Sequence, residues 1–166
     1  MPLKSNSINK FLFKKIKLIV FDFDGVMTDN RVMVDGKGRE AVFCHRADGL
    51  GINALQKEKM SVIVISTEKN LVVAARCKKL RLRCYQGVAN KKELLKKYLL
   101  DNKISAENVA YVGNDINDLE CFKFVGLAVA VADSYPEIIA NADYVLKTKG
   151  GYGAVREFCD LIIKNN

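Results

Sequence analysis

Two aspartates that stand one residue apart, Asp22 and Asp24, are the residues of this sequence best suited to chemistry. They come at the end of an apolar run, 16–21, that has the length of a β-strand. Carboxylates this close repel one another, and burying both raises a pKa unless a cation lies beside them. Mg²⁺ prefers oxygen ligands, a few retained waters and a substrate phosphate, so the pair suits Mg²⁺. Asp22 could then attack phosphorus while Asp24 serves as proton donor and base, although the pair alone could equally cap the loop after the strand.

Apolar runs of strand length alternate along the chain with segments of helical periodicity. The predicted strands are 16–21, 62–65, 109–112, 127–131 and 144–146, and the predicted helices are 50–59, 70–80, 91–102, 117–124, 135–140 and 154–164. This alternation is typical of parallel strands joined by helices, so we predict an α/β fold, a three-layer Rossmann-like parallel sheet with helices on both faces. Asp22 and Asp24 then lie at the carboxyl edge of the strands, where such sheets bind ligands.

A β-hairpin is predicted directly after the first strand. Two extended runs, 31–34 and 39–44, flank the sequence Asp-Gly-Lys-Gly, and Asp-Gly is a strong turn signal. No repeat or linker divides the chain, so we predict a single domain, 16–166, without a cap domain over the active site. The segment 1–15 mixes lysines with short apolar patches, and we expect it to be a disordered or docking tail.

Charge and cysteine content narrow the classes of function. Twenty-seven Lys and Arg against 19 Asp and Glu give a formal charge of +8, which suits nucleic acid, an anionic membrane or phosphorylated metabolites. The basic residues scatter through predicted helices without an aromatic platform, which favours solvated helix faces over nucleic-acid binding. No apolar run approaches the roughly 20 residues that span a bilayer. Five cysteines without C-x-x-C spacing predict neither disulfides nor a zinc site, so we expect a soluble cytoplasmic protein.

Four segments together resemble the motifs of the haloacid dehalogenase superfamily. DFDGVMTD is similar to the first motif, in which the first Asp is the nucleophile and the second the general acid/base, and this implies those roles for Asp22 and Asp24. Ser66, which ends the predicted strand 62–65, matches the Ser or Thr that bonds a phosphate oxygen. Lys91, with Lys92 as a competitor, matches the Lys that neutralises nucleophile and phosphate.

The fourth, acidic motif departs from its commonest form, G-D-x-x-x-D. When YVGNDIND is aligned on Gly113 and Asp118, the usual metal-binding Asp corresponds to Asn114. The resemblance implies a Mg²⁺ site with Asp118 in support, and its candidate ligands are Asp22, Asp24, Asn114 and Asp115. Loss of one negative charge at Asn114 should weaken metal binding.

Over about nine-tenths of the chain the resemblance is closer, to the small capless phosphatases of 3-deoxy-octulosonate (KDO) 8-phosphate and of nine-carbon sialic-acid-type 9-phosphates. The hairpin carries it, together with HRADGLG, YQG, VAVAD and GGYGAVRE further along the chain. It implies a homotetramer in which hairpins pair around a central axis and a neighbouring subunit closes each active site.

The residues after Ser66 bear on the substrate. Octulosonate enzymes usually continue with Gly-Arg, whereas Thr67-Glu68-Lys69 looks more like the nine-carbon acid phosphatases and the related domain fused to acylneuraminate cytidylyltransferases. We expect a phosphorylated sugar acid, a nonulosonate 9-phosphate before an octulosonate 8-phosphate. Candidate substrate contacts are Arg46, for the carboxylate, and Thr67, Glu68 and Lys69. A solvated charge pair at a helix start explains Glu68 and Lys69 equally well.

The roles of one histidine and three glycines allow two interpretations each. His45, the single histidine, is expected to face the substrate or a subunit contact. Gly150, Gly151 and Gly153 predict either an anion cradle before a helix or a tight turn.

Two alternatives to a phosphatase stay open. Asn114 in place of an acidic ligand keeps a non-catalytic tetramerisation or regulatory module possible, of the kind associated with acylneuraminate cytidylyltransferases. The charge of +8 leaves a nucleic-acid binder, which predicts salt-sensitive retention of DNA or RNA.

Overall fold

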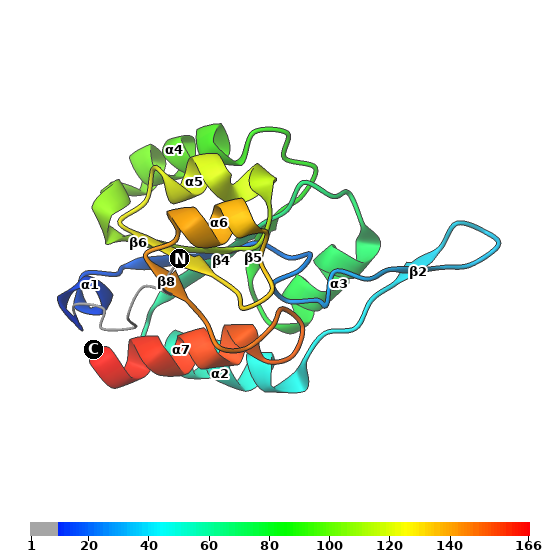
Figure 1. Ribbon diagram of the computed structural model, residues 1–166, viewed down its shortest axis with the longest axis horizontal. Helices are drawn as coiled ribbons and strands as arrows, with labels where there is room; N and C mark the ends of the chain where they lie inside the picture. Colours follow the sequence, from blue (N-terminus) through cyan, green and yellow to red (C-terminus); the bar gives the residue numbers. More distant parts are fainter. Residues whose placement is uncertain (1–9) are drawn as a thin grey trace.

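A six-stranded parallel sheet organises the chain, as the predicted fold class requires (Figure 1). The computed structural model describes residues 10–166, so the first nine residues of the predicted tail lie outside the described residues. The strand order is β5-β4-β1-β6-β7-β8. The strands are β1 (Leu18–Phe21), β4 (Ser61–Ile65), β5 (Arg83–Tyr85), β6 (Val109–Gly113), β7 (Leu127–Ala130) and β8 (Tyr144–Val145). The edge strand β5 was not predicted from the sequence, because its three residues include Arg83 and do not form an apolar run.

Helices cover both faces of the sheet, which confirms the three layers (Figure 1). One face carries α1 (Lys10–Lys14), α2 (Arg46–Lys57), α3 (Leu71–Lys79) and α7 (Ala154–Asn165). The other carries α4 (Lys91–Asn102), α5 (Leu119–Phe122) and α6 (Pro136–Asn141). Short 3₁₀ turns, Ala106–Asn108 and Ile116–Asp118, precede and follow β6. The central strand β1 is buried on both sides because its side chains alternate between the two faces.

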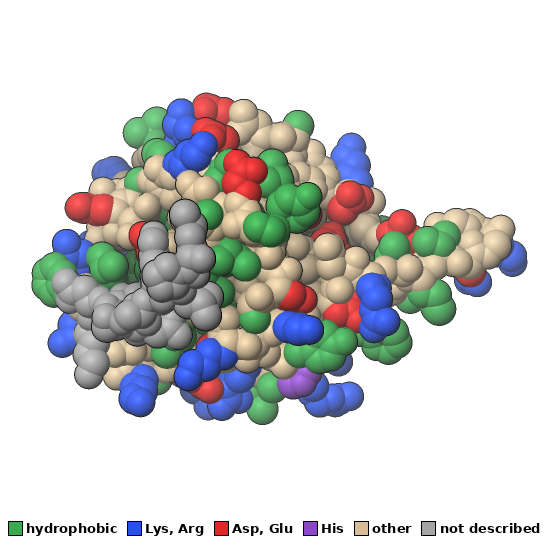
Figure 2. All heavy atoms as spheres, in the orientation of Figure 1, with side chains coloured by type: hydrophobic (Ala, Val, Ile, Leu, Met, Phe, Trp, Pro, Cys, Tyr) green, Lys and Arg blue, Asp and Glu red, His purple; other side chains and the backbone are tan. Residues whose placement is uncertain are grey.

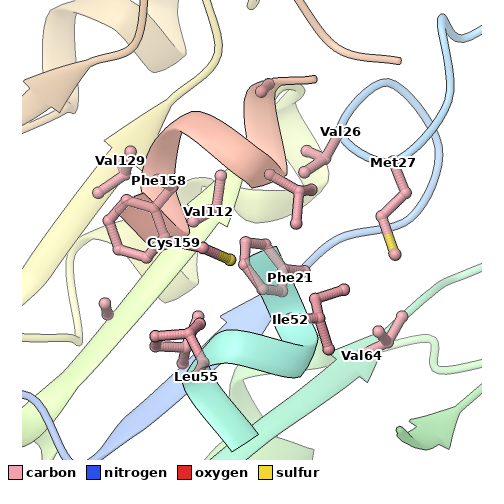
Figure 3. Packing of buried hydrophobic residues seen from close by; sticks show 14 of the residues in the cluster. Phe21, Val26, Met27, Ile52, Leu55, Val64, Val112, Val129, Phe158 and Cys159 are labelled. Atoms are coloured by element: carbon pink, nitrogen blue, oxygen red, sulfur yellow. The ribbon is translucent and has the colours of Figure 1, made fainter. Parts of the chain in front are cut away.

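Close packing between α2 and α7 buries one side of the central strand β1 (Figure 3). The Phe21 ring meets the Phe158 ring edge-on, with centroids 6.1 Å apart and planes at 86°. The two helices approach each other at Gly51, where an added Cβ would lie 2.9 Å from the Cβ of Cys159. The residues directly before Asp22 are therefore held by a dense apolar layer.

The short helix α1 corrects the predicted tail. Phe13 is 3% exposed and packs edge-on against Tyr144, with ring centroids 6.2 Å apart. Ile16, which follows the helix, is also buried. Phe13 thus belongs to the core, although it lies in the segment 1–15 that was expected to be a tail.

The predicted hairpin is present and projects from the body of the domain (Figure 1). Its strands, β2 (Met33–Val34) and β3 (Glu40–Ala41), pair antiparallel. The Asp35 carboxylate closes the turn by accepting the Lys37 and Arg39 backbone N–H groups at 2.8 and 3.0 Å. Apolar side chains lie exposed along the projection (Figure 2). Within residues 10–166, no helix is both long and apolar enough to cross a membrane.

Candidate active site

A cleft of about 310 Å³ opens at the carboxyl ends of the central strands. It includes both aspartates of the first motif, the residues after β4 and β6, and the base of the hairpin. Its lining is Asp22, Asp24, Asn30, Arg31, Val32, Glu40, Val42, Thr67, Glu68, Asn70, Asn114, Asp115 and Asn117. The sheet thus brings together segments that are far apart in the sequence, at the edge where such sheets bind ligands.

Asp22 continues β1 into the cleft. Its backbone N–H donates to the Val112 carbonyl at 3.0 Å, and the residue is only 4% exposed. Its Oδ1 accepts a hydrogen bond from the Lys91 ammonium at 2.8 Å. Burial raises the pKa of Asp22, and the nearby charge of Asp118 raises it further, while Lys91 opposes both. The carboxylate is therefore short of compensating positive charge.

Lys91 is a buried cation between two carboxylates. It is the first residue of α4, and its Nζ lies 2.8 Å from Asp22 Oδ1 and 2.7 Å from Asp118 Oδ1. Burial lowers the pKa of Lys91, but the charges of Asp22 and Asp118 outweigh burial and leave the pKa raised. Lys92, the competitor, instead pairs with the exposed Glu120 at 3.2 Å. Lys91, and not Lys92, therefore lies beside Asp22.

Asp118 anchors this network from behind. Its Oδ1 also accepts the Tyr111 hydroxyl at 2.8 Å, and its Oδ2 accepts the Asn114 backbone N–H at 2.9 Å. Asp118 is fully buried, so each of these bonds offsets part of the cost of removing its charge from water. Asp118 thus lies behind Lys91 and Asn114, and Tyr111 is a member of this network that the sequence did not reveal.

Asp24 stands at the cleft wall and is less buried than Asp22. Burial raises the pKa of Asp24, the charges of Glu68 and Glu40 raise it further, and Lys91 opposes them. The pKa of Asp24 is therefore shifted in the direction that suits a proton donor.

Three oxygens can converge where the sequence predicts a metal. With the Asn114 amide turned one way, its Nδ2 donates to the Asp24 carbonyl at 2.9 Å and to Asp22 Oδ2 at 3.2 Å. Turned the other way, the amide oxygen faces those same two oxygens, which is the donor set that a hard cation such as Mg²⁺ prefers. No group of three His, Cys, Asp or Glu side chains between residues 10 and 166 is arranged for a metal. A metal here needs the amide and carbonyl oxygens.

This arrangement differs from the expected ligand set in two places. Asp24 offers its main-chain carbonyl to the oxygen cluster, which leaves its carboxyl group free. Asp115 lines the cleft, but its Oδ1 accepts the Ile116 backbone N–H at 2.7 Å and caps the following 3₁₀ turn. The three-oxygen cluster therefore contains Asn114 and not the Asp115 carboxylate.

Gly25 lets the loop after Asp24 touch Asn114. Its φ is +82°, and an added Cβ would overlap the Asn114 amide. The Thr28 hydroxyl fixes the same loop by accepting the Gly25 and Asn30 backbone N–H groups at 3.1 and 3.2 Å. The glycine of the first motif is thus required by close approach.

The residues after β4 divide between the cleft and its surroundings. Ser66 is buried, and its Oγ accepts the Glu68 backbone N–H at 3.2 Å. Thr67 and Glu68 line the cleft, as expected for substrate contacts. Lys69 does not line it and lies beside Gly87.

The predicted carboxylate contact, Arg46, is not brought into the cleft. It is exposed in the first turn of α2, where His45 caps the helix by accepting the Ala47 N–H at 3.3 Å. The arginine that does line the cleft is Arg31. Its position as the first residue of the predicted hairpin was the available signal, because the hairpin follows closely on the loop of Asp24.

The glycines before α7 serve close packing. An added Cβ on Gly151, whose φ is +75°, would collide with the backbone of Thr28 and Asp29. The first turn of α7 is capped by the Asp48 carboxylate, whose Oδ1 accepts the Arg156 N–H at 3.0 Å. A buried carboxylate there disfavours an anion, so the structure supports the tight-turn interpretation.

Known proteins resemble this chain over most of its length. The family model described as haloacid dehalogenase-like hydrolase matches residues 56–158. The chain is 40% identical to the 3-deoxy-D-manno-octulosonate 8-phosphate phosphatase of Escherichia coli K12 over 151 residues, which cover 90% of this chain and 80% of that relative. The phosphatase of the same name from Yersinia pestis is 37% identical over 149 residues, 89% of this chain and 80% of the relative.

Solved structures share the fold closely. A hydrolase of the haloacid dehalogenase family from Streptomyces avermitilis has a TM-score of 0.88 at 45% identity, covering 90% of this chain and 86% of its own. The Moraxella catarrhalis 3-deoxy-D-manno-octulosonate 8-phosphate phosphatase, solved with magnesium, phosphate and KDO, has a TM-score of 0.92 at 30% identity, covering 95% and 91%. The corresponding Haemophilus influenzae enzyme, solved with cobalt, has a TM-score of 0.88 at 32% identity, covering 93% and 91%.

Proposed function

Because this chain belongs to the haloacid dehalogenase-like hydrolases and is a phosphoric monoester hydrolase, we propose that it removes the phosphate from a phosphorylated sugar acid with the help of Mg²⁺. The observation that carries the proposal is the buried Asp22–Lys91–Asp118 network, which opens onto a cleft at the edge of the sheet. Such a network holds a nucleophile and a positive charge in place before substrate arrives.

In the proposed reaction Asp22 attacks phosphorus and becomes an aspartyl-phosphate. Asp24 donates its proton to the departing sugar oxygen and then, as a base, takes a proton from the water that hydrolyses the intermediate. The raised pKa of Asp24, caused first by burial and then by Glu68, favours the protonated form that the first step needs. Lys91 stays charged and faces the nucleophile throughout.

Mg²⁺ fits the oxygen cluster formed by Asp22, the Asp24 carbonyl and Asn114. When bound, it would offset the negative charge of nucleophile and phosphate. Asp115, which also lines the cleft, would hold waters of the ion. The Ser66 hydroxyl, which accepts from Glu68 N, keeps its own proton for a phosphate oxygen.

We take 3-deoxy-D-manno-octulosonate 8-phosphate as the first substrate to test, because the named relatives carry that activity in their names. A nonulosonate 9-phosphate is the second candidate, because Thr67 and Glu68 line the cleft where the resemblance predicts the contacts of a nine-carbon sugar. The ratio of kcat/KM on the two phosphates separates them.

We also propose a homotetramer assembled through the hairpin. Val32, Met33 and Val34 are each more than half exposed, and Phe43, at the base of the hairpin, is 76% exposed. Apolar side chains that project together in this way gain free energy when a second copy of the chain covers them. Sedimentation velocity at micromolar protein tests the assembly, and a purely monomeric species would contradict it.

Phosphate release with and without EDTA tests the proposed function. We expect turnover of at least one of the two sugar-acid phosphates with Mg²⁺, its loss on chelation, and a loss on the order of 10⁴-fold or more in Asp22→Asn. Asp101→Asn, an exposed aspartate on α4, is the matched control and should keep full activity. A stable oligomer that releases no phosphate from either substrate would favour the non-catalytic module instead.

A further inference from the structure

Two cysteines outside the active site lie against one another between α3 and the edge strand β5. Cys77 is in the last turns of α3 and is 1% exposed, and Cys84 is the middle residue of β5. Cys84 is paired with Val64 of β4, and paired residues of neighbouring parallel strands point to the same face of a sheet. Val64 and Cys77 both belong to the apolar layer on the face that carries α2, α3 and α7, and Cys84 packs against that layer.

The chain between the two cysteines folds back sharply and keeps them close. Helix α3 ends at Lys79, and the Leu82 backbone N–H donates to the Cys77 carbonyl at 2.9 Å. Arg81 adopts the left-handed backbone conformation within this turn, with φ of +55°. The turn leads directly into β5, where the Cys84 thiol forms a hydrogen bond with the Cys77 thiol. The two sulfur atoms are therefore neighbours in the folded protein.

This hydrogen bond gives the two thiols different reactivity. It lowers the pKa of Cys84, whose sulfur accepts the bond, although partial burial opposes the effect. The same bond raises the pKa of Cys77, and burial raises it further. The thiolate is the form of cysteine that attacks an oxidant. Cys84, which is also the more exposed of the two, is therefore the expected nucleophile, and Cys77 is the partner that keeps its proton.

We propose that Cys77 and Cys84 are a modification site, at which hydrogen peroxide converts the two thiols into a reversible disulfide within the chain. The Cys84 thiolate attacks one oxygen of the peroxide, the O–O bond breaks, and the departing hydroxide takes up a proton to form water, which leaves a sulfenic acid on Cys84. The Cys77 sulfur then attacks the Cys84 sulfur, the S–O bond breaks, and the hydroxide leaves with the Cys77 proton as a second water. Two thiols are oxidised, and one peroxide is reduced to two waters.

The site is separate from the proposed catalytic groups. Neither Cys77 nor Cys84 lines the active-site cleft, and both belong to one chain, so the reaction requires no neighbouring subunit. Cys44 is the competing partner, because it packs against the same apolar layer. The inference does not depend on the proposed function, so it can be tested even on a protein that releases no phosphate.

Peptide mapping of the oxidised protein tests the proposal. The folded wild-type protein is treated with hydrogen peroxide at a concentration that leaves its melting curve unchanged, the remaining thiols are alkylated, and the protein is digested with trypsin without reductant. Lysines and arginines between the two cysteines place them on separate peptides, 77–78 and 84–91. We expect these peptides to be joined, with a mass lower by two hydrogens than their sum. Treatment with a dithiol before alkylation should separate them again.

Serine variants test the order of the two steps. Cys77→Ser should stop at the sulfenic acid on Cys84, which dimedone traps. Cys84→Ser should form no joined peptides and should leave Cys77 reduced. Cys121→Ser is the matched control, because Cys121 is buried in the apolar layer on the opposite face of the sheet, and it should give the joined peptides in the same amount as wild type. Thermal melting checks that each variant is folded, and the wild-type peptide map decides the question if Cys77→Ser does not fold.

Three results would overturn the inference: Cys77 and Cys84 that both stay reduced in peroxide, a disulfide from Cys84 to Cys44, or a disulfide from Cys84 to a second chain. Each of them leaves the proposed function intact, because phosphate release is measured separately. A protein that forms the joined peptides and releases no phosphate would instead retain the modification site and lose the proposed function.

Discussion

Two buried carboxylates, Asp118 and Asp48, meet the same physical problem on opposite faces of the sheet. Asp118 accepts hydrogen bonds from Lys91, Tyr111 and the Asn114 backbone. Asp48 caps α7 through Oδ1, but within the described chain its Oδ2 has no hydrogen-bond partner. Burial accordingly raises the pKa of Asp48 to about 6. The difference shows that three donors compensate the buried Asp118 carboxylate, whereas the α2–α7 junction tolerates an imperfectly paired one.

Removing the Lys91 ammonium should have the largest effect on stability and activity, because it takes away the cation that Asp118 shares with Asp22. Lys91→Met leaves Asp22 and Asp118 as neighbouring buried carboxylates, so we expect a loss of roughly 3–5 kcal/mol in the free energy of unfolding. The variant should also lose about 10²–10³-fold or more in kcat. Urea denaturation and phosphate release measure the two effects. Lys92→Met, whose ammonium pairs with exposed Glu120, should change stability by less than about 0.5 kcal/mol; comparable losses in both variants would contradict the network.

The pH dependence of stability should reveal the imperfect pairing of Asp48. Its folded-state pKa of about 6 lies above the ordinary value of 3.8, so the folded protein takes up a proton, and gains stability, as pH falls through 6. The free energy of unfolding of wild type relative to Asp48→Asn should therefore rise by about 1.4 kcal/mol from pH 7.5 to pH 5. Denaturant melts of both proteins across that range measure it. Parallel stability curves would show that the unpaired Oδ2 carries no such cost.

The smallest effect should come from Tyr111→Phe. The change removes one donor to Asp118 and leaves the Lys91 bond in place, so we expect a loss of about 1 kcal/mol in stability. A fall of a few-fold in kcat should accompany it. Tyr144→Phe, a buried tyrosine that packs on Phe13 away from this network, is the control. If both variants matched wild type in urea melts and in kcat, Tyr111 would have only a packing role.

The sequence specified the frame of the site well and its finer contacts poorly. Asp22, Ser66 and the acidic loop after β6 each follow a strand. Their positions near one another could be predicted because the carboxyl ends of parallel strands lie at the same edge of the sheet. Between Lys91 and Lys92 the choice depended on helix rotation, which adjacent positions in a sequence do not reveal. Only the fold directs one ammonium inward and the other to Glu120.

Backbone atoms and loop paths account for the other differences. The Asp24 oxygen that lies beside Asn114 is its main-chain carbonyl. Every residue has such a carbonyl, so the residue type does not predict this contact. Arg46 was a candidate because a guanidinium suits a substrate carboxylate, but the N-cap at His45 turns the chain into α2 and leaves Arg46 on the outside. Arg31 reaches the cleft because the loop that carries it is short and pinned at Thr28.

The Lys91–Asp22 bond joins residues that are 69 positions apart, and the Lys91–Asp118 bond spans another 27. Contacts of such long sequence separation form late in folding, after the intervening strands have found their partners. A chain growing from its amino terminus therefore carries its nucleophile for most of its synthesis without the groups that complete it. Activity becomes possible only once β6 and the turn after it have joined the sheet. Catalytic activity therefore requires that the central strands of the sheet have assembled.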